Sequence, residues 1–395
     1  MINRFKIQEI EILLKQFPVV AIIGPRQCGK TTLTKMEVLK LKQTGLYFDL
    51  ESPKDSSKFY DAEYFLESIS SDVDCIVIDE VQRMPELFSL LRSLVDKNKQ
   101  KGKYVLLGSA SPELVKGVSE SLAGRIAYCE ISPLNITEVY QNKDDINKLW
   151  FRGGFPDAWL CETNEDWFRW MDNFFRTFIE RDLNTLFGVS FSASLMYKLW
   201  RMLAHNHGQM LNAQSLAKGL DVSPTTVNRY IDFLEGAFMI RRLPAYFTNA
   251  KKRLIKSPKI YIRDSGLLNY LLDITKENDI HFHSNVGNSW EGYALEQILQ
   301  HLPNFIKPFY YRTHDGSEMD LILVRGITPI ACIELKTTNN PSVTRGFYES
   351  VKDLKSESNF VVTPFQDISY KLNDNTLVCG LVDFITKELI KFITI

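Results

Sequence analysis

A glycine-rich loop near the start of the chain combines residue types that bind phosphate. It runs from Gly24 to Thr31 as Gly-Pro-Arg-Gln-Cys-Gly-Lys-Thr, between an apolar β-type run and a helical pattern. In such a loop backbone N–H groups surround the phosphates of a nucleotide, and the helix dipole adds to the attraction. The setting argues against a chance match. Nucleotide contact is predicted for Gly24, Pro25, Arg26, Gln27, Cys28, Gly29, Lys30, Thr31 and Thr32.

Three side chains of this loop have more specific predicted roles. Lys30 would neutralise the β and γ oxygens of ATP, the Thr31 hydroxyl would ligate Mg²⁺, and Thr32 would cap or line the same turn. For Arg26 and Gln27 we predict backbone contact alone, because the loop pattern does not constrain their side chains.

Polar residues end two further apolar runs. Asp79 and Glu80 follow Cys75–Ile78, as a buried strand would deliver them to the carboxyl edge of a parallel sheet. There Asp79 would hold Mg²⁺ through water and Glu80 would polarise the attacking water, which favours hydrolysis over transfer to a metabolite. Ser109, which follows Tyr104–Leu107, is the predicted sensor of the γ-phosphate, and a turn-forming serine is the alternative.

Several other charged residues and two histidines have less specific predicted roles. Arg125 could supply positive charge to the transferring phosphoryl group, in cis or across the interface of a homo-oligomer, or it could be an exposed turn residue. Asp49 and Glu51 could reach the magnesium shell, but a solvated strand end is the preferred interpretation. His205 and His207, two residues apart on a predicted helix, would face different sides of it, so a shared metal is not expected and ordinary surface or packing roles are.

A second acidic group lies near the C-terminus. Asp320 and Glu334 on neighbouring predicted strands could ligate Mg²⁺, and Glu291 on the preceding helix could complete the shell. Lys336, two residues after Glu334, points to the same face and could position water. The arrangement resembles that of PD-(D/E)XK nucleases. A module that keeps these residues as a binding or structural surface, without cleavage, is the preferred alternative.

Residues 195–262 form a basic segment. They hold eleven Lys or Arg residues against three Asp or Glu, a net charge of +8, in the pattern of a helix-turn-helix with a trailing wing. Such a module could neutralise the phosphates of DNA or another nucleic acid, or it could pack against protein, with Lys251–Arg253 reaching back to the nucleotide or to solvent. Nucleic-acid contact is predicted for Thr225, Thr226, Asn228, Arg229, Lys252 and Arg253.

The order of elements predicts several domains. Short apolar runs alternate with helical patterns over the first 130 residues, which is typical of an α/β fold with a parallel sheet. Strands are predicted at Val19–Ile23, Leu46–Leu50, Cys75–Ile78, Tyr104–Leu107 and Ala127–Ile131, and helices at Thr31–Lys42 and Glu86–Asn98. The predicted domains are a P-loop ATPase at 1–145, a helical linker at 146–194, a winged helix-turn-helix at 195–265 and an α+β domain at 266–395.

Composition narrows the class of protein. The 395 residues are 45% apolar and carry a net charge of −1, so the chain as a whole gives no sign of a polyanionic partner. Six cysteines without a C-x-x-C pair argue against a zinc knuckle or a disulfide framework and favour the cytoplasm. No apolar run approaches the ~18–20 residues of a membrane-spanning helix, so no membrane contact is expected.

Taken together, the motifs resemble a prokaryotic AAA+ ATP-binding family with a C-terminal restriction-endonuclease-like domain. The resemblance extends over nearly the whole chain, because further matching segments lie at Gly153–Pro156, Arg181-Asp182, Asp264–Leu267 and Glu318–Lys336. It implies an ATPase core, a winged helix and a nuclease-like tail. The predicted function is Mg²⁺-dependent ATP hydrolysis coupled to nucleic-acid or protein contact, and the alternative is a nucleotide-dependent switch with an inert tail. A nucleotide kinase would leave the C-terminal half unexplained.

Overall fold

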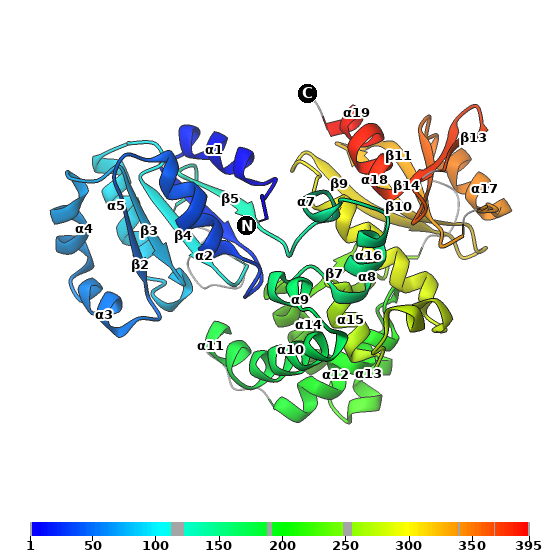
Figure 1. Ribbon diagram of the computed structural model, residues 1–395, viewed down its shortest axis with the longest axis horizontal. Coiled ribbons are helices and arrows are strands. Elements are labelled where there is room, and N and C mark those ends of the chain that lie inside the picture. Colours follow the sequence, from blue (N-terminus) through cyan, green and yellow to red (C-terminus); the bar gives the residue numbers. More distant parts are fainter. Residues whose placement is uncertain are drawn as a thin grey trace.

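Five short apolar runs form the first sheet. The computed structural model describes residues 2–111, 122–187, 192–247, 255–338, 340–366 and 368–393. All neighbouring strands pair in parallel in the order β2-β3-β4-β1-β5, and the sheet lies to the left in Figure 1. The strands are β1 (Val19–Ile23), β2 (Gly45–Asp49), β3 (Cys75–Asp79), β4 (Tyr104–Gly108) and β5 (Ile126–Glu130).

Apolar cores cover both faces of this sheet. Successive residues of β1 face opposite cores: Val20 joins the core that contains Leu33, and Ala21 joins the core that contains Leu91. This double burial explains why the strands show no polar alternation and confirms the parallel α/β prediction. The helices are α1 (Ile7–Gln16), α2 (Lys30–Leu33), α3 (Pro53–Ser56), α4 (Ala62–Ser70) and α5 (Leu87–Lys97). The helical segment predicted at 31–42 is present at 30–41, but it is not α-helical throughout: α2 changes after Leu33 into a π-helical turn and then a 3₁₀ turn.

A helical region follows the sheet. Its aromatic residues form a packing core, in which Trp150, Trp167 and Phe178 are fully buried. The helices are α7 (Ile136–Val139), α8 (Asp144–Arg152), α9 (Pro156–Leu160), α10 (Asn164–Thr177) and α11 (Leu183–Phe187), with a π-helical turn at Phe178–Asp182 between the last two.

Three helices and a three-stranded antiparallel sheet come next. The Ser223 side chain accepts a hydrogen bond from Thr226 N at 3.1 Å and caps the last helix, as expected for serine at such a start. The elements are α12 (Ala193–His205), β6 (Gln209–Met210), α13 (Ala213–Leu220), α14 (Pro224–Gly236), β7 (Ile240–Leu243) and β8 (Lys259–Ile262). Strand β8 lies between β6 and β7. His207 follows α12 rather than lying on it, so the shared-helix premise was wrong, and its side chain is buried.

The last part of the chain forms a six-stranded mixed sheet of order β13-β14-β12-β11-β10-β9. Helix α16 (Val286–Leu299) precedes it and is buried along most of its length. The strands are β9 (Ile306–Arg312), β10 (Glu318–Arg325), β11 (Thr328–Leu335), β12 (Asn359–Thr363), β13 (Ser369–Asn373) and β14 (Thr376–Gly380). The other helices are α15 (Ser265–Leu271), α17 (Arg345–Leu354), α18 (Leu381–Asp383) and α19 (Ile390–Ile393).

One continuous apolar core extends from the helical region through the three-stranded sheet to one face of the six-stranded sheet, and a second, smaller core lies between that sheet and α17. The larger core runs from the aromatic helices through α14 to residues of the six-stranded sheet such as Leu323 and Ile333. The predicted boundaries at 195 and 266 therefore lie within a shared core, and the division into domains stays a prediction. None of the helices in the described ranges is both long and apolar enough to cross a membrane.

Candidate functional site

The glycine-rich loop has the backbone geometry that its sequence predicts. Gly24 has φ +153°, and a Cβ there would lie 2.0 Å from the Ile131 carbonyl oxygen, so this close approach requires glycine. Gly29 has φ +95° and occupies the N-cap of α2. Gln27 also has a positive φ, and the Cys28 thiol donates to Ile131 O at 3.4 Å. The loop thus turns tightly at the carboxyl end of β1.

Lys30 is folded back into the loop. Its ammonium group donates to the carbonyl oxygens of Gly24 at 2.9 Å and Pro25 at 2.7 Å, and the side chain is buried. These carbonyls hold a positive charge inside the loop, at the point where phosphate oxygens would otherwise accept from Lys30.

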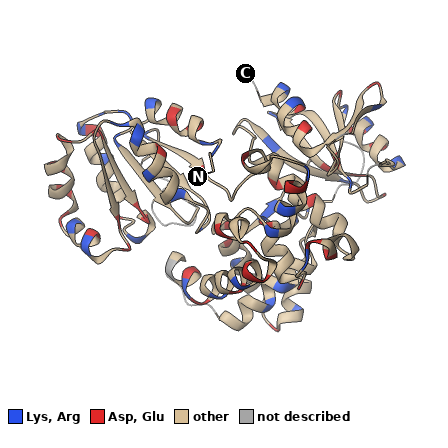
Figure 2. Cartoon of the chain, viewed as in Figure 1, with Lys and Arg blue, Asp and Glu red and all other residues tan. Residues whose placement is uncertain are grey.

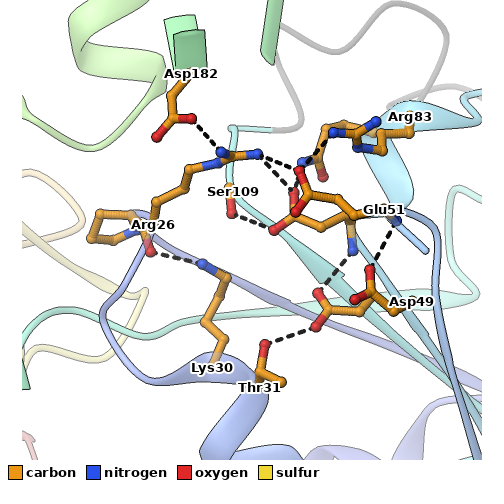
Figure 3. Close-up of polar contacts among 12 residues, drawn as sticks. Arg26, Lys30, Thr31, Asp49, Glu51, Arg83, Ser109 and Asp182 are labelled. Carbon is orange, nitrogen blue, oxygen red and sulfur yellow. Dashed lines mark hydrogen bonds and ion pairs between the residues drawn. The ribbon is translucent and has the colours of Figure 1, made fainter. Parts of the chain in front are cut away.

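Thr31 and Asp79 meet beneath the loop. The Thr31 hydroxyl donates to Asp79 Oδ2 at 2.7 Å, which joins the start of α2 to the end of β3 (Figure 3). The Tyr47 hydroxyl donates to the same Asp79 oxygen, and burial followed by this hydrogen bond raises the pKa of Tyr47. A hydroxyl beside a carboxylate at a sheet edge is an oxygen pair suited to Mg²⁺.

Glu80 follows Asp79 and is held by neighbours from other strand ends. Ser109 donates to Glu80 Oε1 at 3.2 Å, and Gln82 donates to Oε2. Burial raises the pKa of Glu80, although the charges of Lys30 and Arg26 oppose this effect. The structure therefore brings the predicted residues Lys30, Thr31, Asp79, Glu80 and Ser109 together at one edge of the sheet. Figure 3 labels Lys30, Thr31 and Ser109 of this group.

The side chain of Arg26 has contacts that the sequence did not reveal. It donates to Glu51 Oε1 at 3.1 Å and lies 3.8 Å from Glu80 Oε2, while its other terminal nitrogen donates to Asp182. Arg83 binds the same Glu51 oxygen at 2.6 Å. Although burial opposes the effect, these two arginines lower the pKa of Glu51. Glu51 is therefore part of an ion network rather than a solvated strand end.

Asp182 belongs to the π-helical turn between α10 and α11, far from the loop in sequence. Its carboxylate is buried, and burial raises its pKa against the charge of Arg26. The guanidinium of Arg26 therefore connects the phosphate loop to the helical region. No sequence pattern near Arg26 could have predicted this partner, because the contact depends on how the two parts of the chain meet.

A cavity of about 960 Å³ lies on the other side of the loop. Arg4 closes one wall, donating to Cys28 O at 2.8 Å and forming an ion pair with Glu138 at 3.0 Å. Its lining residues include Phe5, Gly29, Thr32, Leu33, Leu134 and Pro156.

Arg125 lies away from this site. It directly precedes β5, and its carbonyl accepts from Val19 N at the amino-terminal end of β1, whereas the glycine-rich loop follows the carboxyl end. Its side chain is paired with Asp96 at 2.6 Å. A role in cis is therefore wrong, because the sheet separates Arg125 from the loop. A role across the interface of a homo-oligomer stays a prediction.

The second acidic group gathers around a lysine. Lys336 donates to Glu334 Oε1 at 2.7 Å, and Asp320 accepts from Leu335 N at 2.9 Å. Burial raises the pKa values of Asp320 and Glu334; the charge of Glu334 adds to the effect at Asp320, whereas Lys336 opposes it at Glu334. Glu291, however, pairs with Lys259 at 2.9 Å. The predicted shell of three carboxylates is not formed, and among the described residues no three His, Cys, Asp or Glu side chains converge as metal ligands would.

Among the described residues of the basic segment, some polar and basic side chains are exposed and others are ion-paired. Thr225, Asn228 and Arg229 are exposed on α14, and Thr226 is half-buried. Other basic residues of 195–262 are ion-paired: Arg201 with Asp273, Arg241 with Glu296, Arg242 with Asp232 and Glu235, and Lys259 with Glu291 and Glu318. Figure 2 shows acidic residues interleaved with basic ones across this half. Lys252 and Arg253 lie outside the described residues.

The chain is similar to several known families and proteins. Residues 16–140 match the AAA domain family, residues 143–278 a domain of unknown function (DUF8612), and residues 286–384 a second domain of unknown function (DUF4143). The Walker-type ATPase of Pyrococcus abyssi, a solved structure, has a TM-score of 0.47 and 16% identity over 69% of this chain and 96% of that chain.

Sequence relatives are closer. Uncharacterized proteins of Mycobacterium tuberculosis and Mycobacterium bovis are each 41% identical over 352 residues, which cover 89% of this chain and 77% of theirs. The AAA domain match agrees with the parallel sheet and confirms the predicted AAA-type P-loop fold of the N-terminal part. In this chain a match to an AAA domain is followed by matches to two domains of unknown function, and the chain belongs to the family of these two mycobacterial proteins.

Proposed function

We propose that this protein is a Mg²⁺-dependent ATPase whose nucleotide state is transmitted to its C-terminal half. The observation that carries the proposal is the 2.7 Å hydrogen bond between Thr31 Oγ1 and Asp79 Oδ2, with Lys30 and Glu80 beside it. These are the oxygen, cation and carboxylate groups that bind and hydrolyse a magnesium nucleotide. The AAA domain match to residues 16–140 supports the same class.

Each side chain has a role that follows from its contacts. Lys30 would exchange the carbonyls of Gly24 and Pro25 for β and γ oxygens, and Thr31 and Asp79 would hold Mg²⁺, which neutralises phosphate charge. Because burial raises the pKa of Glu80, its carboxylate is a better proton acceptor than an exposed one, and it would orient the attacking water. Ser109, bonded to Glu80, would report the γ-phosphate.

The nucleoside would occupy the 960 Å³ cavity beside the loop. Thr32 and Leu33 of α2 line it next to Gly29, so a base there continues from phosphates bound at the loop. The opposite wall comes from Pro156 and Leu160 of α9, which would let the helical region respond to an occupied site.

Arg26 would carry the signal between the two halves. Its guanidinium is shared among Glu51, Glu80 and Asp182, so a γ-phosphate would compete with these carboxylates for one cation. Release of Asp182 would loosen the contact between the loop and the turn after α10. Coupling of this kind requires only that ATP bind better to one arrangement than to the other.

The C-terminal half would act as a docking module. We assign a winged helix-turn-helix to the region of α12–β8 and a restriction-endonuclease-like fold to the six-stranded sheet. The exposed side of α14, with Thr225, Asn228 and Arg229, suits contact with nucleic acid, DNA being the first candidate. Docking on protein is the alternative. Cleavage by Asp320, Glu334 and Lys336 is a second candidate function, favoured by the buried Glu334 Oε2, which has no hydrogen-bond donor among the described residues.

Nucleotide binding by a Lys30→Ala variant tests the proposal. Lys40→Ala is the matched control, because Lys40 is an exposed lysine shortly after α2. Titration with an ATP analogue in Mg²⁺ should give binding for the wild type and Lys40→Ala and none for Lys30→Ala. Equal binding by all three proteins would show that the glycine-rich loop does not bind the nucleotide.

A further inference from the structure

Lys259 lies inside the acidic group of the six-stranded sheet. It starts β8 of the three-stranded sheet, and its side chain is only 4% exposed. Its ammonium nitrogen is 2.9 Å from Glu291 Oε1, 2.8 Å from Glu318 Oε1 and 3.9 Å from Asp320 Oδ1. The ammonium group thus lies among three carboxylates, of which Glu291 and Asp320 were predicted to ligate a divalent metal.

One carboxylate oxygen of Glu291, Oε1, is occupied by this arrangement. Its Oε1 accepts from Lys259 and also from the Tyr261 hydroxyl, which belongs to the same strand. Glu291 is thus bound by two side chains of β8, while Asp320 is bound by the backbone N–H of Leu335. A metal ion that used Glu291 Oε1 would have to displace Lys259 first.

The net charge of the side chains around Lys259 also argues against a bound divalent metal. Four carboxylates, those of Glu291, Glu318, Asp320 and Glu334, are accompanied by three side-chain cations. Lys259 pairs with the first two, Arg312 with Glu318 at 3.1 Å, and Lys336 with Glu334 at 2.7 Å. With all four carboxylates ionised the group carries a net charge of −1, which a divalent ion would change to +1, and Lys259, only 4% exposed, would repel that ion with little screening.

We propose that Lys259 takes the place of a divalent cation in the carboxylate group of Glu291, Glu318 and Asp320, so that this site holds an internal ammonium ion instead of a metal. The site then joins the three-stranded sheet to the six-stranded sheet and does not cleave phosphodiesters. This inference is independent of ATP hydrolysis at the glycine-rich loop, and it decides against the nuclease candidate.

Binding of Mn²⁺ to the full chain without nucleotide tests the proposal, by electron paramagnetic resonance of the free ion. Wild type and Asp320→Asn should bind the same amount, because no metal uses Asp320. Lys259→Met should gain one Mn²⁺ site, with affinity at least tenfold above any wild-type binding at that place. The double variant Lys259→Met with Asp320→Asn should lose the gained site.

Two controls keep the experiment decisive. Lys256→Met removes an exposed lysine of the same segment and should bind Mn²⁺ as the wild type does. If Lys259→Met does not fold, Lys259→Gln replaces it, since its amide can still donate to Glu291. Mn²⁺ bound by the wild type and lost in Asp320→Asn would overturn the proposal. So would the absence of a gained site in both Lys259 variants. Because nucleotide is omitted, failure of the ATPase account would leave these results unchanged.

Discussion

Arg26 of the glycine-rich loop is ion-paired with Asp182, a residue 156 positions later in the chain. The same guanidinium also donates to Glu51 and lies within 3.8 Å of Glu80. One arginine thus contacts the carboxylate beside the predicted water site and the turn that ends α10. If phosphates bind at this loop as proposed, a change in them would alter a direct contact with the helical region.

We expect Asp182→Asn to tighten binding of an ATP analogue several-fold. The substitution weakens a charge-assisted hydrogen bond, worth about 1–3 kcal/mol, that competes with the nucleotide for Arg26. Isothermal titration would measure the change, with the exposed Glu180→Gln on the same turn as the control. In an Arg26→Ala background, Asp182→Asn should have no further effect. An additive effect there would show that the two residues act separately.

Stability should fall in mild acid because of His207. Its ring is buried, its Nδ1 accepts from Ile262 N at 3.0 Å, and burial lowers its pKa to about 3. Below the unfolded pKa of ~6.5 the unfolded chain binds a proton that the folded chain refuses, so stability is lost as pH falls from ~6.5 towards 3. Between pH 7.5 and 5 this amounts to about 2 kcal/mol.

His207→Asn should remove that loss, because the Asn oxygen can still accept from Ile262 N and does not titrate. Urea unfolding at the two pH values would measure it, and His205→Asn is the control, since His205 is exposed. An unchanged pH dependence in His207→Asn would show that other groups cause the acid sensitivity.

Gly153→Ala should destabilise the fold by about 3 kcal/mol or more. Gly153 has φ +76°, and a Cβ there would lie 2.2 Å from Asp264 Oδ1, so strain in the backbone adds to a clash in a buried place. Gly326 has φ +63° with no atom within 4 Å of its Cβ position, so Gly326→Ala isolates the backbone cost of about 1–2 kcal/mol. Denaturant midpoints would compare them, and equal losses would refute the clash.

Arg229→Ala should weaken DNA binding if α14 contacts phosphate. The slope of log affinity against log salt should fall by about 1, because one phosphate contact releases roughly one counterion. Fluorescence anisotropy with a labelled duplex would measure both quantities, with Lys54→Ala on α3 as the control. Binding that does not decline as salt rises would contradict an electrostatic contact.

Local patterns predicted the candidate site where its residues follow strand ends. Lys30, Asp79 and Ser109 each come directly after or near the end of an apolar run, and a parallel sheet brings such ends to one edge. The predicted role of Arg125 in cis was wrong because a basic residue after a helical pattern does not indicate at which edge of the sheet it lies. It precedes β5, so it lies at the opposite edge from the loop.

The missed residues depend on contacts between distant segments. Arg26 meets Asp182 only through the docking of the helical region on the first sheet. Lys259 was counted with the basic surface, although a lysine that opens the apolar run Lys259–Ile262 beside Tyr261 could have indicated burial. What no pattern could supply was its partner, Glu291, on another element.

Hydrolysis of ATP at the glycine-rich loop is tested by the steady-state turnover of Glu80→Gln, with ATP binding measured on the same sample. The variant keeps the shape of the side chain and removes the carboxylate that would orient water. If Glu80 orients the attacking water, ATP still binds to the variant in the presence of Mg²⁺ and turnover falls by about 10²-fold or more. Turnover equal to that of the wild type would contradict hydrolysis at this site.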